Sequence, residues 1–453
     1  MDGKPYKFEG SKIFCYAVGD FGYNFVWTLV SSFLLYFWTD SLQISAGFAG
    51  TVMLLSRIWD AINDPMVGGW ADNTKSKKGR YRPWILYASV PLCIINVICF
   101  TNPGFESMTA RSVWAFVTFF VAVFISTMFY VPYTALLSSL TLDSKARTKA
   151  TSMRLMCAYV AAICITNFTS RLVAYFGNGD SSRGYFITAI IYSIIGIICW
   201  MITYANTKEV VEIKAEKISW GQSFKLLKGN KYVWILAFAF VSYGLFNYGR
   251  NATAVYYFNY VANASDMYGI YGIVHYGMSF VGAALMPALA NKAKNKGSVP
   301  RFCYLITGIM LLIQFFIDPT TSTGMILLLA LQLIASFCAG ASASMLYGMI
   351  PDVVDYTQFI HGKRASGFIS AAVNFMLKMG MALGVALVGW LLEATGYVAN
   401  AVQSMSTIVG LKSLFALLPG AFALMAFIFL CFYRLDKKSH AEMLDKMNIQ
   451  VNN

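Results

Sequence analysis

The chain has 453 residues, of which 58% are hydrophobic and only 12% are charged, and its formal net charge is +14. Soluble domains carry roughly 25% charged residues, so this composition excludes an ordinary soluble enzyme and predicts an all-α integral membrane protein. The basic residues are divided among short connections between apolar runs. We therefore interpret the positive charge as membrane topology and expect no nucleic-acid partner.

Apolar runs recur along the whole chain, and most exceed the roughly 20 residues that a membrane-spanning helix needs. The longest polar stretch, 206–231, divides them into two sets of six. We therefore expect a helical bundle at 1–205, a cytoplasmic central loop at 206–231, a second bundle at 232–433 and a tail at 434–453. The twelve predicted spans lie at approximately 12–39, 44–70, 83–102, 110–139, 152–176, 185–205, 232–262, 267–290, 302–317, 324–350, 366–394 and 408–433.

Every second connection is rich in lysine and arginine, whereas the others, such as TDSLQIS and DPTTSTG, are poor in lysine. Basic loops stay on the cytoplasmic side of a membrane, so both termini are predicted to be cytoplasmic in a multi-pass plasma membrane protein, with the bacterial inner membrane as the expected location. The basic loops after the second and eighth spans occupy matching places in the two halves. This correspondence is typical of the repeats in two-lobed transporters.

Two aspartates stand at the end of the second apolar run, in the stretch SRIWDAINDP. On a helix, Asp60, Asn63 and Asp64 share one face. Each ionised aspartate inside a bilayer costs roughly 2.5–3.5 kcal/mol, and a bound cation or proton removes that cost. Their oxygen atoms suit a hard cation such as Na⁺. The alternative is that the pair lies near the cytoplasmic end and only caps the helix or forms an ion pair with Arg57 or the basic loop.

These residues carry a resemblance that extends over most of the chain. SRIWDAINDP, followed by GGWADNTKSKKGRYRPW, resembles the signature of the glycoside–pentoside–hexuronide:cation symporters, the sugar carriers of the major facilitator superfamily that include the melibiose carriers. The resemblance implies the fold of that superfamily and the symport of a sugar or glycoside with Na⁺, H⁺ or Li⁺ by a monomer in membrane lipid. The other stretches that carry it are GDFGYN, YFWTD, VPYTALLSSLTLD, AVYYFNYV, MIPDVVDYTQFIHGKRASG and GYVANAVQS.

The resemblance also implies which residues bind the cation and the sugar. It assigns the cation to Asp60, Asn63, Asp64 and Thr127, with the two aspartates as the Na⁺ ligands if sodium is the coupling ion. Melibiose carriers have acids at the positions of Asn24 and Tyr130, so their galactoside specificity is not carried over. The predicted substrate-binding residues are Asp20, Asn24, Tyr130, Arg154, Arg250, Asn374 and Lys378.

Three of these residues have alternative interpretations. Asp20 lies in the same cavity as the sugar or only supports helix packing. Lys378 lies about twelve residues inside a span and needs a carboxylate partner, for which Asp60 or Asp64 is our expectation; otherwise it reaches the cytoplasmic surface. Arg250 binds an anionic sugar such as a hexuronide, bonds neutral hydroxyls, pairs with Asp20 or forms an outer gate.

Charged residues next to the basic loops resemble the cytoplasmic latches of the superfamily. The alternative interpretation is that they only determine the orientation of the chain in the membrane. The predicted gating residues are Asp72, Arg80 and Arg82 in the first half and Asp352, Asp355 and Arg364 in the second.

Two other classes of protein remain at this stage. An uncoupled facilitator or an exporter with the same fold would need no cation, and Asp60→Asn would leave its transport intact. An enzyme or sensor is disfavoured, because the three histidines (His275, His361 and His440) are widely separated and no cluster of nucleophile and base is visible. We expect no cofactor other than the coupling cation, and no ATP, because no phosphate-binding motif is present.

Overall fold

The computed structural model describes residues 8–141, 143–210, 229–292, 297–361, 366–435 and 443. Clustering of the contacts divides the chain into two compact units. Unit 1 comprises Met1–Ala215, Ser265–Gly272 and Tyr397–Val402, and unit 2 comprises Glu216–Ala264, Ile273–Gly396 and Gln403–Asn453. Most of the predicted central loop and of the predicted tail lies outside the described residues.

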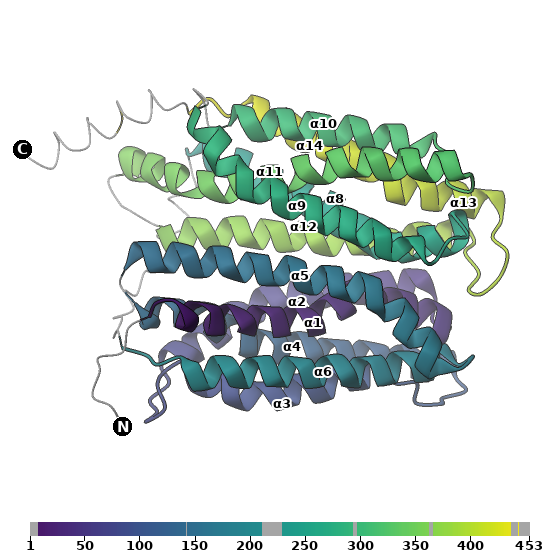
Figure 1. The fold of residues 1–453 in the computed structure, drawn as a ribbon, viewed down its shortest axis with the longest axis horizontal. Coiled ribbons are helices and arrows are strands. Elements are labelled where there is room, and N and C mark those ends of the chain that lie inside the picture. Colours follow the sequence, from purple (N-terminus) through teal and green to yellow (C-terminus); the bar gives the residue numbers. More distant parts are fainter. Residues whose placement is uncertain are drawn as a thin grey trace, which may run out of the picture. The chain divides into compact units, whose positions relative to one another are not determined.

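Six long helices build unit 1 and run side by side in Figure 1. Helix α1 packs against α5 and α6, and α4 packs against α2 and α3. Several helices begin where the sequence supplies a cap: Ser45 accepts a hydrogen bond from the Phe48 amide at the start of α2, and Asp180 accepts from the Ser182 amide at the start of α6. The bounds are α1 Ser11–Tyr36, α2 Ala46–Asp72, α3 Arg82–Cys99, α4 Met108–Leu140, α5 Ser144–Gly177 and α6 Ser181–Asn206.

Unit 2 contains the remaining helices, except for the start of α9 up to Gly272, and α8 is its centre. It packs against α12 and α14, while α10 packs against α11 and α14. The close approach of α8 and α12 requires glycine: a Cβ on Gly380 would lie 2.2 Å from the Val241 carbonyl oxygen. The bounds are α8 Lys231–Tyr256, α9 Met267–Lys292, α10 Ser298–Phe315, α11 Ser322–His361, α12 Ser366–Ala394, α13 Met405–Lys412 and α14 Leu418–Cys431.

The first helices of the two units end in the same way. A π-helical turn follows α1 at Phe37–Ser41 (η1), and another follows α8 at Tyr257–Val261 (η2). Each turn leads to a residue with positive φ, Gln43 at 54° and Asn263 at 50°. The flanking hydrogen bonds match as well, with N–H to O=C distances between 2.9 and 3.0 Å in both. This shared local structure adds to the sequence indication of an internal repeat.

Two predicted connections prove to be helical. The basic segment after the fourth span belongs to the start of α5, and α11 continues beyond the predicted end at residue 350 to His361. Asp352 and Asp355 therefore lie on a helix rather than in a loop. Pro351 lies inside α11, and a single proline removes only one hydrogen bond from a long helix. A third π-helical turn, Ser413–Leu417 (η3), joins α13 to α14.

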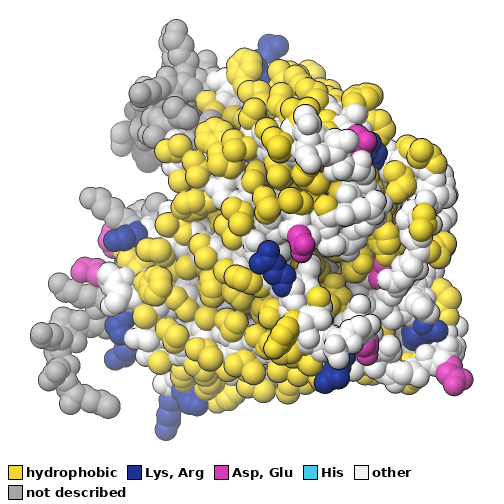
Figure 2. Space-filling model, turned by 45° about the vertical axis from the view of Figure 1, so that its right-hand side comes forward, with side chains coloured by type: hydrophobic (Ala, Val, Ile, Leu, Met, Phe, Trp, Pro, Cys, Tyr) yellow, Lys and Arg dark blue, Asp and Glu magenta, His cyan; other side chains and the backbone are white. Residues whose placement is uncertain are grey.

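Helices long and apolar enough to cross a membrane number ten among the described residues. Figure 2 shows that apolar side chains cover most of the visible face, with Lys and Arg mainly at its margins. This distribution is that of a multi-pass membrane protein.

Candidate functional site

The first cluster of predicted site residues lies between α2 and α4. The Thr127 hydroxyl donates a hydrogen bond of 2.9 Å to the Asp60 carboxylate, and both side chains are buried. Asp60 is therefore inside unit 1, not at a water-exposed helix end. Asp64 lies one turn further along α2 and is half-buried.

Asn63 is the most informative member of this cluster. The residue is completely buried, yet neither its amide nitrogen nor its amide oxygen has a hydrogen-bond partner among the described residues. Such a group is rare in folded proteins and needs an explanation, one of which is a bound ion. The Asp60 carboxylate, the Asn63 carbonyl and the Thr127 hydroxyl offer the hard oxygen ligands that Na⁺ prefers.

Arg57 is also part of this cluster. Its guanidinium lies 3.8 Å from the Asp60 carboxylate and 5.0 Å from the centre of the Trp27 ring. The ion pair between α2 residues that the sequence offered as an alternative is thus present together with the Thr127 hydrogen bond. Arg57 is thus a positively charged neighbour of Asp60, and Thr127 is its hydrogen-bond donor.

The second cluster joins α1, α4 and α5 around Arg154. The Arg154 guanidinium lies 3.3 Å from the Asp20 carboxylate and 3.3 Å from the Tyr130 hydroxyl. Asn24 donates a 2.8 Å hydrogen bond to the Asp20 main-chain carbonyl, one turn earlier on α1. The structure therefore brings together Asp20, Tyr130 and Arg154, and Asn24 lies one turn from Asp20 on α1.

Aromatic rings connect the two clusters. Tyr23 stacks on Tyr130 with ring centres 4.3 Å apart, and the hydroxyls of Tyr23 and Ser126 are hydrogen-bonded at 2.8 Å. Ser126 directly precedes Thr127 of the first cluster. Sequence reasoning missed Ser126, whose signal is a second hydroxyl beside Thr127 in the apolar run of α4.

In unit 2, Arg250 lies in a buried polar network. It is 2% exposed, and its guanidinium donates to the side-chain oxygens of Gln314 and Gln332 at 2.7 and 2.6 Å, and to the Phe415 carbonyl. Gln332 in turn donates to the Ser336 hydroxyl at 2.8 Å, and its amide lies 3.2 Å from His275 Nδ1. Sequence reasoning missed these partners of Arg250, although Gln314 and Gln332 each interrupt an apolar run.

The other two predicted substrate residues of unit 2 lie on α12. Lys378 is half-buried and Asn374 is exposed. Asp60 and Asp64 belong to the other unit, so the predicted pairing of Lys378 with one of them stays a prediction.

The predicted latch of the first half has a defined local structure between α2 and α3. The Tyr81 hydroxyl donates to Asp72 at 2.7 Å, and burial together with this bond raises the pKa of Tyr81 to about 12. Arg82 donates to the Tyr204 carbonyl at 2.9 Å and lies over the Tyr204 ring. These contacts hold the loop against the end of α6.

Glu209, which follows α6, binds the end of this loop, and sequence reasoning missed it. Its carboxylate accepts hydrogen bonds from three successive main-chain amides, those of Arg80, Tyr81 and Arg82, at 2.8 to 2.9 Å. Such a row of amides at a helix start is an anion-binding arrangement. Glu209 therefore caps α3. In the second half, Asp352 is buried, Asp355 is half-buried, and Arg364 lies outside the described residues.

Comparison with known proteins identifies the family of the chain. The family model described as MFS/sugar transport protein matches residues 15–437. The chain belongs to this family. Among its relatives is the isoprimeverose transporter of Lactiplantibacillus pentosus, 31% identical over 94% of this chain and 89% of that protein. Another is the putative glycoside/cation symporter YagG of Escherichia coli K12, 30% identical over 93% of this chain and 91% of that protein.

A relative of lower identity carries the name of an exporter. The putative 2,3-dihydroxypropane-1-sulfonate exporter of Salmonella typhimurium is 28% identical over 95% of this chain and 94% of that protein. Among solved structures, the D-xylose-proton symporter has a TM-score of 0.68 at 13% identity and covers 94% of this chain and 98% of its own. At that identity the likeness concerns the fold, which is the major facilitator fold. The transporter is thus a multi-pass membrane carrier of the sugar-transport class and not an enzyme.

Proposed function

We propose that the transporter imports a sugar or glycoside, a pentoside, hexoside or hexuronide, together with a monovalent cation by alternating access. The observation that carries the coupling is the buried, unpartnered amide of Asn63 beside the Asp60–Thr127 hydrogen bond. Na⁺ or H⁺ is the proposed co-substrate, and Li⁺ is a possible substitute for Na⁺. The glycoside/cation symporter among the relatives supports the same function.

The proposed sugar site in unit 1 is the cluster around Arg154. Arg154, Asp20 and Tyr130 supply charged and neutral hydrogen-bonding groups, and the Tyr130 ring offers a face for a sugar ring. The residues predicted on α8 and α12, Arg250, Asn374 and Lys378, remain part of the proposal for unit 2. The galactoside preference of melibiose carriers is not proposed.

The proposed coupling runs from the cation to the sugar through α4. A cation beside Asp60 neutralises the carboxylate and engages Thr127, and the chain from Ser126 through Tyr23 to Tyr130 links that position to the sugar site. Cation binding then raises sugar affinity, and by linkage the sugar raises cation affinity by the same factor. A carrier with an unneutralised carboxylate resists closure, because a charge in a low-dielectric interior is costly.

The test is uptake into proteoliposomes that contain the purified transporter and no other energy source. A panel of radiolabelled pentosides, hexosides and hexuronides is presented under an inward Na⁺ gradient, an inward H⁺ gradient, the corresponding outward gradients or no gradient. We expect accumulation above the external concentration under one ion gradient only. Equilibration without accumulation under every condition would identify an uncoupled facilitator, and accumulation driven only by an outward gradient would identify an exporter-type exchange.

We also propose the orientation of the transporter in the membrane and its oligomeric state. The basic connections place both termini in the cytoplasm of a bacterial inner membrane, and a single chain is proposed to be the working unit. Reporter fusions at the two ends, which are active only in the cytoplasm or only outside it, test the orientation.

A further inference from the structure

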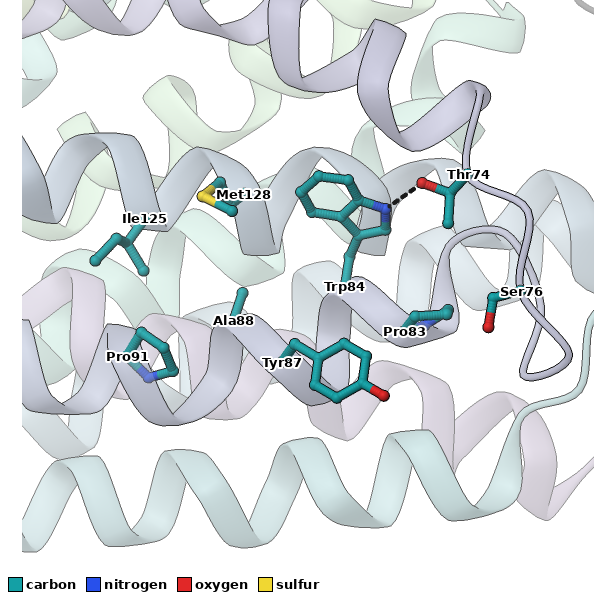
Figure 3. A pocket seen from close by; sticks show the side chains of 9 residues that line it. All are labelled: Thr74, Ser76, Pro83, Trp84, Tyr87, Ala88, Pro91, Ile125 and Met128. Carbon is teal, nitrogen blue, oxygen red and sulfur yellow. Dashed lines mark hydrogen bonds between the residues drawn. The ribbon is translucent and has the colours of Figure 1, made fainter.

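A cavity of about 360 Å³ opens between α3, α4 and the loop that follows α2. Figure 3 shows Trp84, Tyr87 and Pro91 of α3 facing Ile125 and Met128 of α4 across this space. Its size falls in the range of roughly 300–1,000 Å³ typical of ligand pockets. The cavity is separate from the cluster around Arg154 and from the cluster around Asp60, none of whose residues line it.

The residues that line this cavity lie on the same faces of α3 and α4 as the exposed apolar side chains of these helices. On α3, Tyr87 and Ile94 are 65% and 55% exposed, and Pro91 lies between them on the same face. On α4, Val117 and Val121 are exposed at four-residue spacing, and Ile125 follows at the same interval. In a membrane protein such outward apolar faces contact lipid chains, so the cavity is a widening of a lipid-facing groove.

The groove is held open by local packing at its loop end. The Trp84 indole donates a 2.9 Å hydrogen bond to the Thr74 hydroxyl, which fixes the largest side chain of the wall against the loop (Figure 3). Ala88, one turn further along α3, contributes only a methyl group to the wall. The space between these two residues therefore stays unfilled by the protein.

The same end of the groove carries positive charge. The Lys78 ammonium lies 3.4 Å from the Tyr87 hydroxyl and 5.5 Å from the centre of its ring, so it is placed at the rim of the groove. Lys75 and Lys77 are exposed beside it in the same loop, whose side of the membrane is predicted to be cytoplasmic. Basic residues next to a membrane surface attract anionic lipid headgroups.

We propose that this groove binds an anionic phospholipid, with an acyl chain between α3 and α4 and the headgroup phosphate at Lys78. Apolar walls that face the bilayer and a basic rim at one end match the two parts of such a lipid. A sugar or other polar solute fits the apolar walls poorly, since its hydroxyls would lose water without gaining hydrogen bonds. The proposal does not depend on which sugar or cation the transporter moves.

The experiment uses the full chain in nanodiscs of phosphatidylcholine doped with phosphatidylglycerol that carries a photoreactive diazirine in one acyl chain. After illumination, adducts are mapped by peptide mass spectrometry. We expect labelling of the peptides that contain Pro91 and Ile125. The corresponding phosphatidylcholine probe is expected to label them less.

Two pairs of variants make the test specific. Ile125→Trp fills the groove, whereas Val117→Trp adds the same bulk on the same face of α4 outside it. Lys78→Ala removes the charge at the rim, whereas Lys231→Ala removes a lysine in a similar contact, 5.2 Å above the Tyr232 ring, away from the groove. Only Ile125→Trp and Lys78→Ala are expected to lower labelling by the phosphatidylglycerol probe, the latter about fivefold, as the loss of one lysine near anionic lipid implies.

Three results would each overturn the proposal. The first is equal labelling of Ile125→Trp and Val117→Trp, and the second is equal labelling of the native chain by both probes. The third is an equal effect of the two lysine variants. If Ile125→Trp is not monodisperse, Met128→Trp blocks the groove from the next turn and is read in the same way.

Discussion

The Arg154 guanidinium and the Asp20 carboxylate form an ion pair of 3.3 Å in the interior of unit 1, with side chains only 13% and 5% exposed. An ion pair this deeply buried stabilises only if both partners remain, because removal of one leaves a charge without compensation. The same two residues are proposed to bind the sugar, so they serve the fold and the substrate together.

Arg154→Gln is therefore expected to destabilise the transporter by about 3–5 kcal/mol, the usual cost of breaking a buried pair. Thermal denaturation in detergent measures the loss. Lys149→Gln, which changes an exposed lysine on the same helix, is the control and should leave the denaturation temperature unchanged. A variant at 154 as stable as the control would show that the pair does not support unit 1.

Thr127→Val is expected to weaken the response of uptake to the ion gradient, because it removes the hydroxyl that contacts Asp60. A hydrogen bond to a charged group contributes roughly 1.5–3 kcal/mol, so the cation concentration for half-maximal stimulation should rise about tenfold or more. Thr127→Ser, which keeps the hydroxyl, should restore most of the response.

The matched control is Thr118→Val on the same helix. The Thr118 hydroxyl donates to main-chain carbonyls of its own helix, at 2.7 and 3.3 Å, and forms no hydrogen bond with the Asp60 cluster among the residues that the structure describes. If both valine variants lower the response equally, the effect is one of helix packing and the proposed cation site is wrong.

Tyr130→Phe is expected to raise the KM for the transported sugar while keeping the stacked ring. It removes the hydroxyl that lies 3.3 Å from Arg154, and a lost hydrogen bond of about 0.5–1.5 kcal/mol corresponds to a rise of up to roughly tenfold. Tyr192→Phe removes a buried hydroxyl bonded to Thr169 in a different part of unit 1 and should leave KM unchanged. An unchanged KM in the 130 variant would exclude its hydroxyl from the sugar site.

Arg250→Lys is expected to destabilise unit 2, because a lysine cannot reproduce the fork that contacts Gln314 and Gln332. We expect a loss of at least about 1.5 kcal/mol, measured by thermal denaturation.

Competition assays test separately whether Arg250 binds an anionic sugar. If neutral xylosides inhibit uptake and hexuronides do not, that interpretation of Arg250 is ruled out.

Glu209→Gln is expected to cost roughly 0.5–2 kcal/mol, which is typical of losing a helix cap. The glutamine keeps an acceptor oxygen but loses the charge that the three amides of the α3 start receive. Limited proteolysis of the loop before α3 reports the loosening, which Glu106→Gln, a change in an exposed loop, should not produce. Cleavage at the native rate in the 209 variant would contradict this role.

The sequence alone was sufficient to predict the helical class, since composition and apolar run length follow directly from the cost of placing backbone polar groups in lipid. The same reasoning indicated Asp60, Asn63 and Asp64 of unit 1, because they are polar residues on one helix face in apolar surroundings, whereas Arg154 came from the family resemblance. It was wrong where it ended the tenth helix at residue 350, because α11 continues past the apolar run and through Pro351 to His361.

The tertiary structure decided which of these side chains touch. Periodicity places Asp60 and Asn63 on one helix face, but only the packing of α2 against α4 brings Thr127 to 2.9 Å from Asp60. The same packing leaves the Asn63 amide buried without a hydrogen-bond partner in the described part of the chain. Glu209 gave no comparable signal, and the two glutamines around Arg250 gave only that of a polar residue within an apolar run. Their roles depend on partners 64 to 129 residues away in the chain. The sequence by itself thus determined that the chain folds in a lipid bilayer, because the free energy of transferring its apolar residues from water to lipid is favourable. The contacts that make a site were decided by three-dimensional packing, because they join residues that no local pattern relates.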